Sequence, residues 1–164
     1  LYGKVRAWVK EASPGTLYDL YGGMGSIGLA CADLVEHVQS VESVLEASED
    51  GRHNAAVNGV NNITFHTDKV KNFLKGVLLQ EGRLPEDAAV VLDPPREGLH
   101  PKALRRLIEL SPSRILYVSC KPAMLAREMG DLLEAYTIAG MSAVDLFPHT
   151  RHVELVVQFE RHGA

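Results

Sequence analysis

Short apolar runs alternate with amphipathic stretches along most of the chain. The apolar runs have the length of buried strands and lie at residues 16–21, 38–41, 63–66, 88–92 and 115–119. Apolar residues at helical spacing lie between or beside them, at residues 5–10, 26–36, 43–58, 101–110 and 122–133. Strands that alternate with helices in this way predict an α/β fold with a mainly parallel sheet.

The end of the chain departs from this alternation. Two more strands are predicted at residues 143–147 and 153–160, with only the loop 148–152 between them. So short a loop cannot form a parallel crossover, so the two strands should pair antiparallel. The pattern therefore predicts a Rossmann-like, mainly parallel seven-stranded sheet with one antiparallel strand near its end, as in many S-adenosylmethionine methyltransferases. In such sheets, ligands bind beyond the C-terminal ends of the strands.

Composition narrows the class of protein. The chain has 164 residues and is 46% hydrophobic, which suits one domain with a substantial core. Its net charge of −4 gives no global attraction for phosphates, so a nucleic-acid role needs a local basic patch or a further domain. The sequence shows no membrane-spanning run and no signal-peptide pattern. Its two cysteines suit a reducing compartment, so we expect a cytoplasmic protein without a metal.

The first predicted strand runs into a glycine-rich turn. The spacing Gly23-x-Gly25-x-x-Gly28 lets the backbone turn sharply and approach a ligand closely. Dinucleotide enzymes use the same spacing, and a tight turn without any ligand is a further alternative. Asp19 precedes the glycines, where a carboxylate would repel a pyrophosphate but suit the sulfonium and amino groups of S-adenosylmethionine. The turn therefore favours S-adenosylmethionine over NAD.

Carboxylates follow the next two strands as well. Glu42 ends the second strand and is placed to accept hydrogen bonds from ribose hydroxyls, as a carboxylate does in NAD enzymes. Asp68 follows the third strand and is placed to face an adenine edge. The alternatives are a surface acid near a helix N-terminus for Glu42 and a helix cap for Asp68.

The fourth strand ends at a stiff turn, Asp93-Pro94-Pro95-Arg96. The prolines hold the carboxylate of Asp93 at a fixed place over the sheet edge. Amino-methyltransferases carry an aromatic residue after a similar turn, where it stacks on a base. Arg96 stands at that position here, which argues against nitrogen methylation; a purely structural turn is the alternative.

The two cysteines differ in their surroundings. Cys120 follows the fifth strand and precedes Lys121 and a predicted helix. A helix N-terminus and a neighbouring lysine both favour the thiolate, which is the nucleophilic form of sulfur. Cys31 lies within a predicted helix among small apolar residues and is expected to be a buried core residue. Cys120 is therefore the candidate nucleophile.

A carboxylate also begins the last strand. Glu154 precedes Leu155, Val156 and Val157, and a carboxylate partly desolvated by such neighbours is suited to proton abstraction. His152 alternates with Glu154 along the chain and should point to the same face. On these grounds either residue is a candidate base.

Four motifs, in this order, resemble those of the RNA uracil-C5 methyltransferases. The resemblance covers nearly the whole chain and rests on Asp19-Leu20-Tyr21-x-Gly23-x-Gly25, Asp93-Pro94-Pro95-Arg96-x-Gly98, Tyr117-Val118-Ser119-Cys120-x-Pro122-Ala123-x-Leu125-Ala126-Arg127 and Phe147-Pro148-x-Thr150-x-His152-Val153-Glu154. The sequence departs from the family's usual residues at three positions: the family usually has Cys at Gly22 and Asn at Lys121, and commonly Gln at His149. None of these departures removes a proposed catalytic group.

The resemblance implies a tRNA or rRNA substrate, S-adenosylmethionine as cofactor, and covalent catalysis. Cys120 would add to uracil C6, so that C5 takes the methyl group, and the base that then removes the C5 proton would be Glu154 rather than His152. Asp93 and Arg96 would hold the uracil, which must leave its stack to reach the sulfur. The cofactor would be bound by Asp19, Tyr21, Gly23, Gly25, Glu42, Asp68 and Asp93.

The resemblance also bears on domain organisation. Full-length members carry an RNA-binding N-terminal portion and a Phe-Gln-x-Asn segment ahead of the position of Leu1. We therefore expect residues 1–164 to be one catalytic domain, a C-terminal fragment of a longer protein. Two alternative functions stay open: a methyltransferase with a nitrogen target, and a truncated cofactor- or RNA-binding module without activity.

Overall fold

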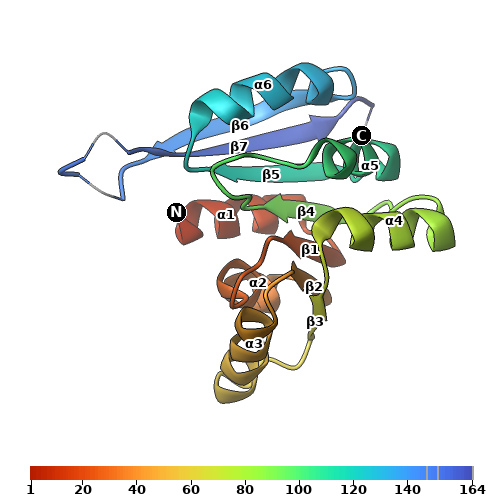
Figure 1. Cartoon of the computed structure of the whole chain (residues 1–164), viewed down its shortest axis with the longest axis vertical. Helices are drawn as coiled ribbons and strands as arrows, with labels where there is room; N and C mark the ends of the chain where they lie inside the picture. Colours follow the sequence, from red (N-terminus) through yellow and green to blue (C-terminus); the bar gives the residue numbers. More distant parts are fainter. Residues whose placement is uncertain (147, 151, 164) are drawn as a thin grey trace.

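The computed structural model describes residues 1–146, 148–150 and 152–163, and its centre is one seven-stranded sheet (Figure 1). The strands lie in the order β3-β2-β1-β4-β5-β7-β6, and β7 pairs antiparallel with both of its neighbours. The predicted fold, mainly parallel with one antiparallel strand near its end, is confirmed. The bounds are β1 Thr16–Leu20, β2 His37–Glu42, β3 Ile63–Thr67, β4 Ala89–Leu92, β5 Arg114–Ser119, β6 Tyr136–Val144 and β7 Glu154–Arg161.

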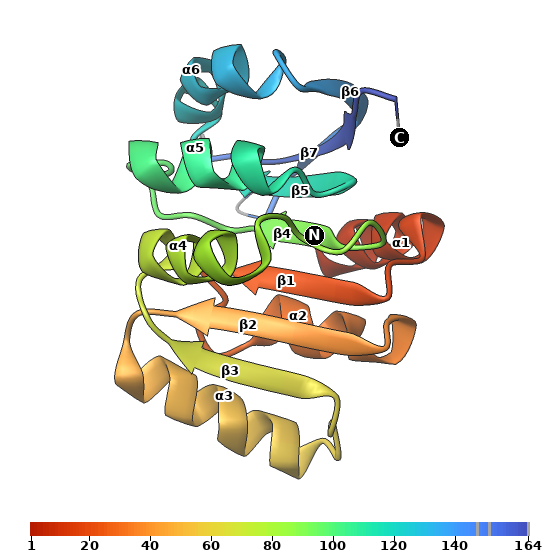
Figure 2. The same ribbon diagram turned by 90° about the vertical axis from the view of Figure 1, so that its right-hand side faces the viewer.

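Helices cover both faces of the sheet (Figure 2). One face carries α1 (Tyr2–Ala12), α2 (Ser26–Cys31), the short 3-10 helix Ala32–Leu34 and α3 (Leu45–Val57). The other face carries α4 (Val70–Glu81), α5 (Pro101–Leu110) and α6 (Pro122–Leu132). Among the helices of the described residues, none is both long and apolar enough to cross a membrane.

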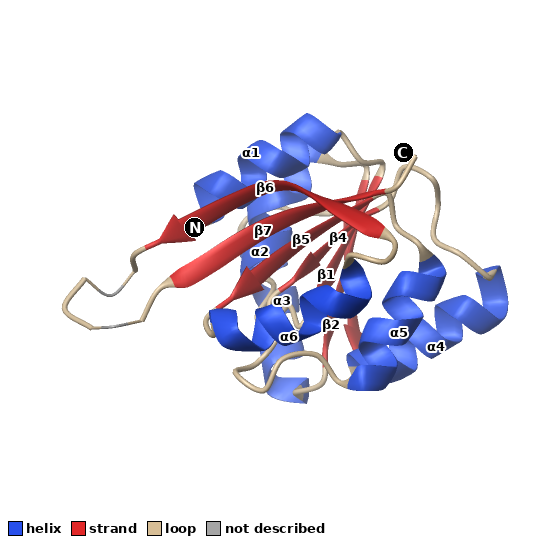
Figure 3. Ribbon diagram, turned by 90° about the horizontal axis from the view of Figure 1, so that it is seen from above, coloured by secondary structure: helices blue, strands red, loops and turns tan. Residues whose placement is uncertain are grey.

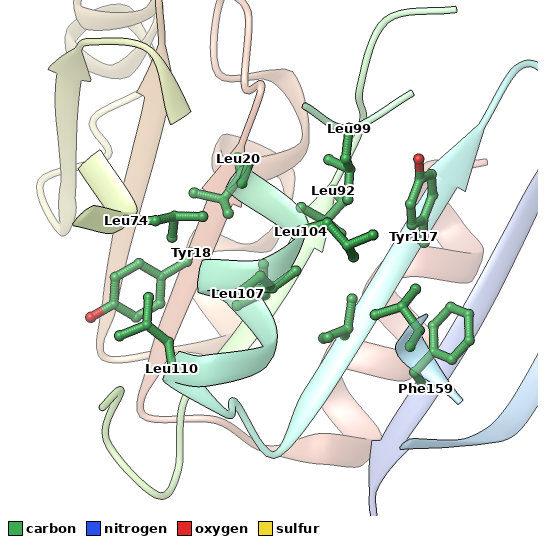
Figure 4. Packing of buried hydrophobic residues seen from close by; sticks show 14 of the residues in the cluster. Tyr18, Leu20, Leu74, Leu92, Leu99, Leu104, Leu107, Leu110, Tyr117 and Phe159 are labelled. Atoms are coloured by element: carbon green, nitrogen blue, oxygen red, sulfur yellow. The ribbon is translucent and has the colours of Figure 1, made fainter. Parts of the chain in front are cut away.

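The strands supply two cores because successive side chains point to opposite faces. In β1, Leu17 packs with the α1–α2 side, whereas Tyr18 and Leu20 pack with the α4–α5–α6 side. Figure 4 shows the second core, in which Leu104 and Leu107 of α5 meet the strand residues. Both clusters are almost fully buried, so the sheet is a fixed platform for the loops at its edge.

The largest differences between the structure and the predicted elements are at α4 and β6, and the helix predicted at 26–36 ends at Cys31 and continues as a short 3-10 helix. Helix α4 was not predicted, although Val70, Phe73 and Leu74 have helical spacing and pack against the core. The predicted strand 143–147 is instead β6, which begins at Tyr136. Strand β6 is an edge strand with mostly exposed residues, so it lacks the continuous apolar run of a buried strand. Residue 147 lies outside the described residues.

Candidate active site

The glycine turn after β1 is built from left-handed backbone. Tyr21, Gly23 and Gly25 have φ angles of 64°, 56° and 79°, and α2 begins at the next residue, Ser26. Glycine adopts this conformation without strain, whereas a tyrosine there is unusual. The turn thus reverses the chain at the C-terminal edge of the sheet, and α2 begins there.

Asp19 lies beneath this turn and is fully buried. Its Oδ2 accepts hydrogen bonds from the Gly28 backbone N–H (3.0 Å) and the Ser40 hydroxyl (3.4 Å). Its Oδ1 has no hydrogen-bond partner among the described residues. Burial raises the pKa of Asp19 to about 6, and the nearby carboxylates of Asp93 and Glu42 act in the same direction. Asp19 therefore braces the turn with one oxygen and leaves the other unpaired.

Glu42 joins the end of β2 to the glycine turn. Its Oε2 accepts a hydrogen bond from the Gly23 N–H at 3.1 Å, and its Oε1 accepts one from the Val44 N–H at 2.8 Å. Asp68 follows β3 and precedes α4, and its backbone N–H donates a hydrogen bond of 2.9 Å to the backbone carbonyl of Glu42. Its Oδ1 accepts hydrogen bonds from the Lys69 N–H (2.7 Å) and from the Asn72 side chain (3.1 Å), which hold the carboxylate just ahead of α4.

A cavity of about 310 Å³ lies beside the glycine turn. The ends of β1 and β2 and the N-termini of α4 and α5 line it, through Tyr21, Val41, Ser43, Lys69, Val70, Lys71 and His100. Burial raises the pKa of Tyr21 to about 12, so its phenol stays neutral and can donate a hydrogen bond. Val41 and Ser43, the sequence neighbours of Glu42, line the cavity. Its walls are partly apolar and partly polar, as a nucleoside requires.

A second group of residues meets where β5 ends and β7 begins. The antiparallel ladder ends at the pair Ser119–Leu155, so Cys120 and Glu154 are the next residues on the two strands (Figure 3). Arg96, Cys120, His152 and Glu154 line one hollow of about 190 Å³. The structure therefore brings together the candidate nucleophile, both candidate bases and the arginine of the Asp-Pro-Pro-Arg turn.

A larger hollow of about 350 Å³ adjoins the first. It shares Arg96, Cys120 and His152 with it and adds Lys121, Pro122, Ala123 and Val153. Cys120 is half-buried, whereas Cys31 is a fully buried member of the α1–α2 core, as predicted. Burial raises the pKa of Cys31 to about 12, which keeps that thiol protonated.

Asp93 lies between the two groups, directly after β4. Its backbone N–H donates a hydrogen bond of 3.3 Å to the Leu20 carbonyl, at the end of β1. Partial desolvation raises the pKa of Asp93 to about 6, and the negative charge of Glu154 adds to this. Glu154, at the start of β7, is therefore close enough to Asp93, at the end of β4, for its charge to affect the Asp93 carboxyl group.

Glu128 of α6 supports the Asp-Pro-Pro-Arg turn and was not predicted from the sequence. It is only 8% exposed, and its Oε1 accepts a hydrogen bond of 2.7 Å from the Leu99 N–H. Its Oε2 accepts one of 2.6 Å from the Tyr117 hydroxyl. At Gly98, where φ is +80°, a Cβ would lie only 2.2 Å from Glu128 Oε1. The signal in the sequence was the position of Glu128, three residues after the buried Leu125 on the same helix face.

Comparison with known proteins identifies the family. Residues 4–162 match the family described as tRNA (Uracil-5-)-methyltransferase. The chain belongs to this family. The predicted membership, which rested on four motifs, is confirmed.

Curated relatives of the family agree with this assignment. An uncharacterized RNA methyltransferase of Caldanaerobacter subterraneus subsp. tengcongensis is 38% identical over 162 residues, which are 98% of this chain and 35% of that protein. One from Nitratidesulfovibrio vulgaris is 38% identical over 157 residues, which are 96% of this chain and 34% of that protein. The chain thus spans about a third of the length of these relatives.

A solved member of the family has the same fold. The crystal structure of Pyrococcus abyssi tRNA (uracil-54, C5)-methyltransferase, in complex with S-adenosyl-L-homocysteine, superimposes with a TM-score of 0.79 at 33% identity. The match covers 96% of this chain and 38% of the Pyrococcus protein. TrmN from Thermus thermophilus, at 20% identity and a TM-score of 0.70, shares the fold.

Proposed function

We propose that this chain is the catalytic domain of an S-adenosylmethionine-dependent enzyme that methylates C5 of a uridine in tRNA or rRNA. The observation that carries the proposal is the meeting of Cys120, Glu154 and Arg96 in one hollow at the sheet edge. Methylation at C5 of uracil needs a nucleophile, a base and a group that holds the ring. These three side chains supply the three functions.

The residues of the first group fit the cofactor. Asp19 offers a buried carboxylate with an unpaired oxygen at the glycine turn, where a sulfonium or amino group would be stabilised. Tyr21, Gly23, Gly25 and Glu42 surround the same turn, and Asp68 and Asp93 follow the neighbouring strands. S-adenosylmethionine supplies the methyl group. The Pyrococcus abyssi relative, solved with S-adenosyl-L-homocysteine, supports this assignment.

The covalent step begins at Cys120. Its thiolate attacks C6 of the uracil, a carbon–sulfur bond forms, and the electron pair of the C5–C6 double bond moves to C5 and the C4 carbonyl. C5 becomes an enolate carbon, which would form a bond to the methyl group supplied by S-adenosylmethionine as the bond between that methyl group and the sulfonium sulfur breaks. The ring carries negative charge at this stage, and the guanidinium of Arg96 is placed in the hollow to stabilise it.

Elimination then regenerates the nucleophile. The carboxylate of Glu154 removes the proton from C5, the C5–C6 double bond forms again, and the bond between C6 and the Cys120 sulfur breaks. Glu154 is the base in this proposal because of its place in the sheet. It is adjacent to Leu155, the last residue of β7 that pairs with β5, and therefore lies opposite Cys120, which follows Ser119. His152 lines the same hollow from the preceding loop and completes the proposed catalytic set with Asp93.

Trapping with 5-fluorouridine RNA tests the mechanism. Fluorine at C5 cannot be removed as a proton, so the methylated ring should stay attached to the protein. With S-adenosylmethionine present, we expect mass spectrometry to find one RNA adduct at Cys120 in the unmodified chain and in Cys31→Ala. The variant Cys120→Ala should form none. An adduct at another residue, or none in the unmodified chain, would contradict the proposal.

A further inference from the structure

A concentration of positive charge lies at the start of α4 and α5, over the first two turns of each helix. Residues 69–75 and 100–106 contain six of the chain's 17 lysines and arginines and neither aspartate nor glutamate. We call them the α4–α5 basic surface: Lys69, Lys71, Lys75, Lys102, Arg105 and Arg106. The chain as a whole has a net charge of −4, so this concentration is local.

The two helix starts lie side by side, so the charges form one surface (Figure 2). The guanidinium of Arg106 donates a hydrogen bond to the backbone carbonyl of Lys71. Lys71 of α4 and His100, which caps α5, line the same cavity. Desolvation lowers the pKa of His100, and the charges of Lys71, Lys102 and Arg106 lower it further. Three cations, from α4 and from α5, therefore lie near His100.

None of the six residues of this surface forms an ion pair with another residue in the described part of the chain. Arg105 lines a hollow with the acidic residues Glu109, Asp131 and Glu134, so the other five cations carry the inference. The N-termini of α4 and α5 add the positive ends of their helix dipoles at the same place. Like charges held together in this way favour an anionic ligand with several charges along its length.

A short segment of the chain joins the surface to the candidate active site. The segment 93–100 leads from Asp93 through Arg96 to the start of α5, so only a few residues separate the catalytic hollow from the basic surface. The cofactor cannot be the anion in question, because S-adenosylmethionine has no phosphate. A nucleic acid strand with its target base in the hollow would have phosphates on either side of that base.

We propose that the α4–α5 basic surface binds the phosphodiester backbone of the RNA substrate beside the target uridine; this rests on the proposed function. The contact is electrostatic and independent of sequence, because lysine and arginine bind phosphates without reading bases. It gives a chain with acidic net charge a local means of holding RNA.

Salt-dependent binding of a labelled, uridine-containing single-stranded RNA tests this. The variant Lys75→Gln/Lys102→Gln removes two charges from residues that line neither the cavity nor the hollows. The control Lys4→Gln/Lys10→Gln removes two charges from α1, on the opposite face, so the net charge is matched. Each lost phosphate contact lowers the slope of log K against log salt by about 0.7. We expect a slope smaller by about 1.4 and roughly tenfold weaker binding at low salt for the first pair.

The outcomes separate the two proposals. A control pair that lowers the slope as much as the α4–α5 pair, or an α4–α5 pair that leaves it unchanged, would overturn the basic surface as the RNA contact. Adduct formation with 5-fluorouridine RNA is read separately on the unmodified chain. Absence of that adduct would overturn the proposed function, whatever the slopes are.

Discussion

The phenol of Tyr117 in β5 donates a hydrogen bond of 2.6 Å to the carboxylate of Glu128 in α6. The other oxygen of Glu128 accepts a hydrogen bond from Leu99, just beyond the turn that carries Asp93 and Arg96. One buried carboxylate thus connects β5, which ends just before Cys120, with the segment that follows the Asp93–Arg96 turn. Burial raises the pKa of Glu128, while both hydrogen bonds act to lower it.

Replacing Glu128 should therefore affect catalysis as well as stability. Glu128→Ala leaves the Leu99 N–H and the Tyr117 hydroxyl unpaired and opens a cavity, which should cost about 2–4 kcal/mol in unfolding free energy. Because the Asp93–Arg96 turn loses its support, formation of the 5-fluorouridine adduct should slow more than tenfold. Tyr117→Phe is the control, since it keeps the Leu99 hydrogen bond. If it slowed the adduct equally, lost stability rather than turn placement would be the cause.

The choice of Glu154 as base predicts a trapped intermediate. Glu154→Gln cannot accept the C5 proton, so an adduct with ordinary uridine RNA should accumulate at Cys120, and release of methylated RNA should fall by a factor of about 10²–10⁴. His152→Gln should release product without accumulating the adduct. Denaturing gel shift and mass spectrometry measure both. Accumulation in His152→Gln, with turnover in Glu154→Gln, would reverse the assignment.

The pKa of Asp19, raised to about 6, predicts a dependence of stability on pH. The folded state binds a proton at this site more tightly than the unfolded chain, whose aspartates titrate near 3.9. The contribution of Asp19 to stability should therefore be fully present below that value and be lost as pH rises from about 4 to about 6, by roughly 2–3 kcal/mol. Urea unfolding of the chain and of Asp19→Asn across this range measures the effect. The variant should show a flatter profile; an equally steep one would mean that other groups cause it.

Cofactor affinity should change with pH in the opposite sense. Asp19 is proposed to stabilise a cationic group, so protonation below a pH of about 6 would remove that attraction. Calorimetric titration with S-adenosylmethionine should show affinity falling as pH is lowered through 6. Asp19→Asn should bind more weakly at neutral pH and with less dependence on pH. Affinity that rises on acidification would argue against a charged contact.

The side chain of Ser40 limits the space available at Gly22. A Cβ at Gly22 would lie 2.3 Å from the Ser40 hydroxyl, which donates the hydrogen bond to Asp19. The residue more usual in the family, Gly22→Cys, should therefore destabilise this chain by about 1–3 kcal/mol through overpacking. Ser40→Ala should relieve part of that cost, so a double-mutant cycle of unfolding free energies should give a coupling of about 1 kcal/mol. Additive effects would show that the turn relaxes without involving Ser40.

Most of the architecture could be predicted because the buried strands are continuous apolar runs, and each is closely followed by glycine, proline, a carboxylate or cysteine. The helix 101–110 was predicted with the observed bounds, and the antiparallel pairing of the last strands followed from their short connection. Strand β6 was misplaced because an exposed edge strand has little hydrophobic pattern. Glu128 was missed because its importance lies in contacts with Leu99 and Tyr117, which are distant in sequence and become neighbours only in the folded chain.

The ladder between β5 and β7 positions the reacting groups independently of the loop that connects β6 with β7. The spacing between Cys120 and Glu154 is fixed by the pairing that ends at Ser119 and Leu155, not by the connection 145–153. Exchanges at Leu146 and His149 of that connection, which are exposed and line neither hollow, should therefore leave the reacting groups in place, whereas His152 is held to its part in the hollow. An engineer seeking a new target site would begin with these two positions and keep the chemistry unchanged.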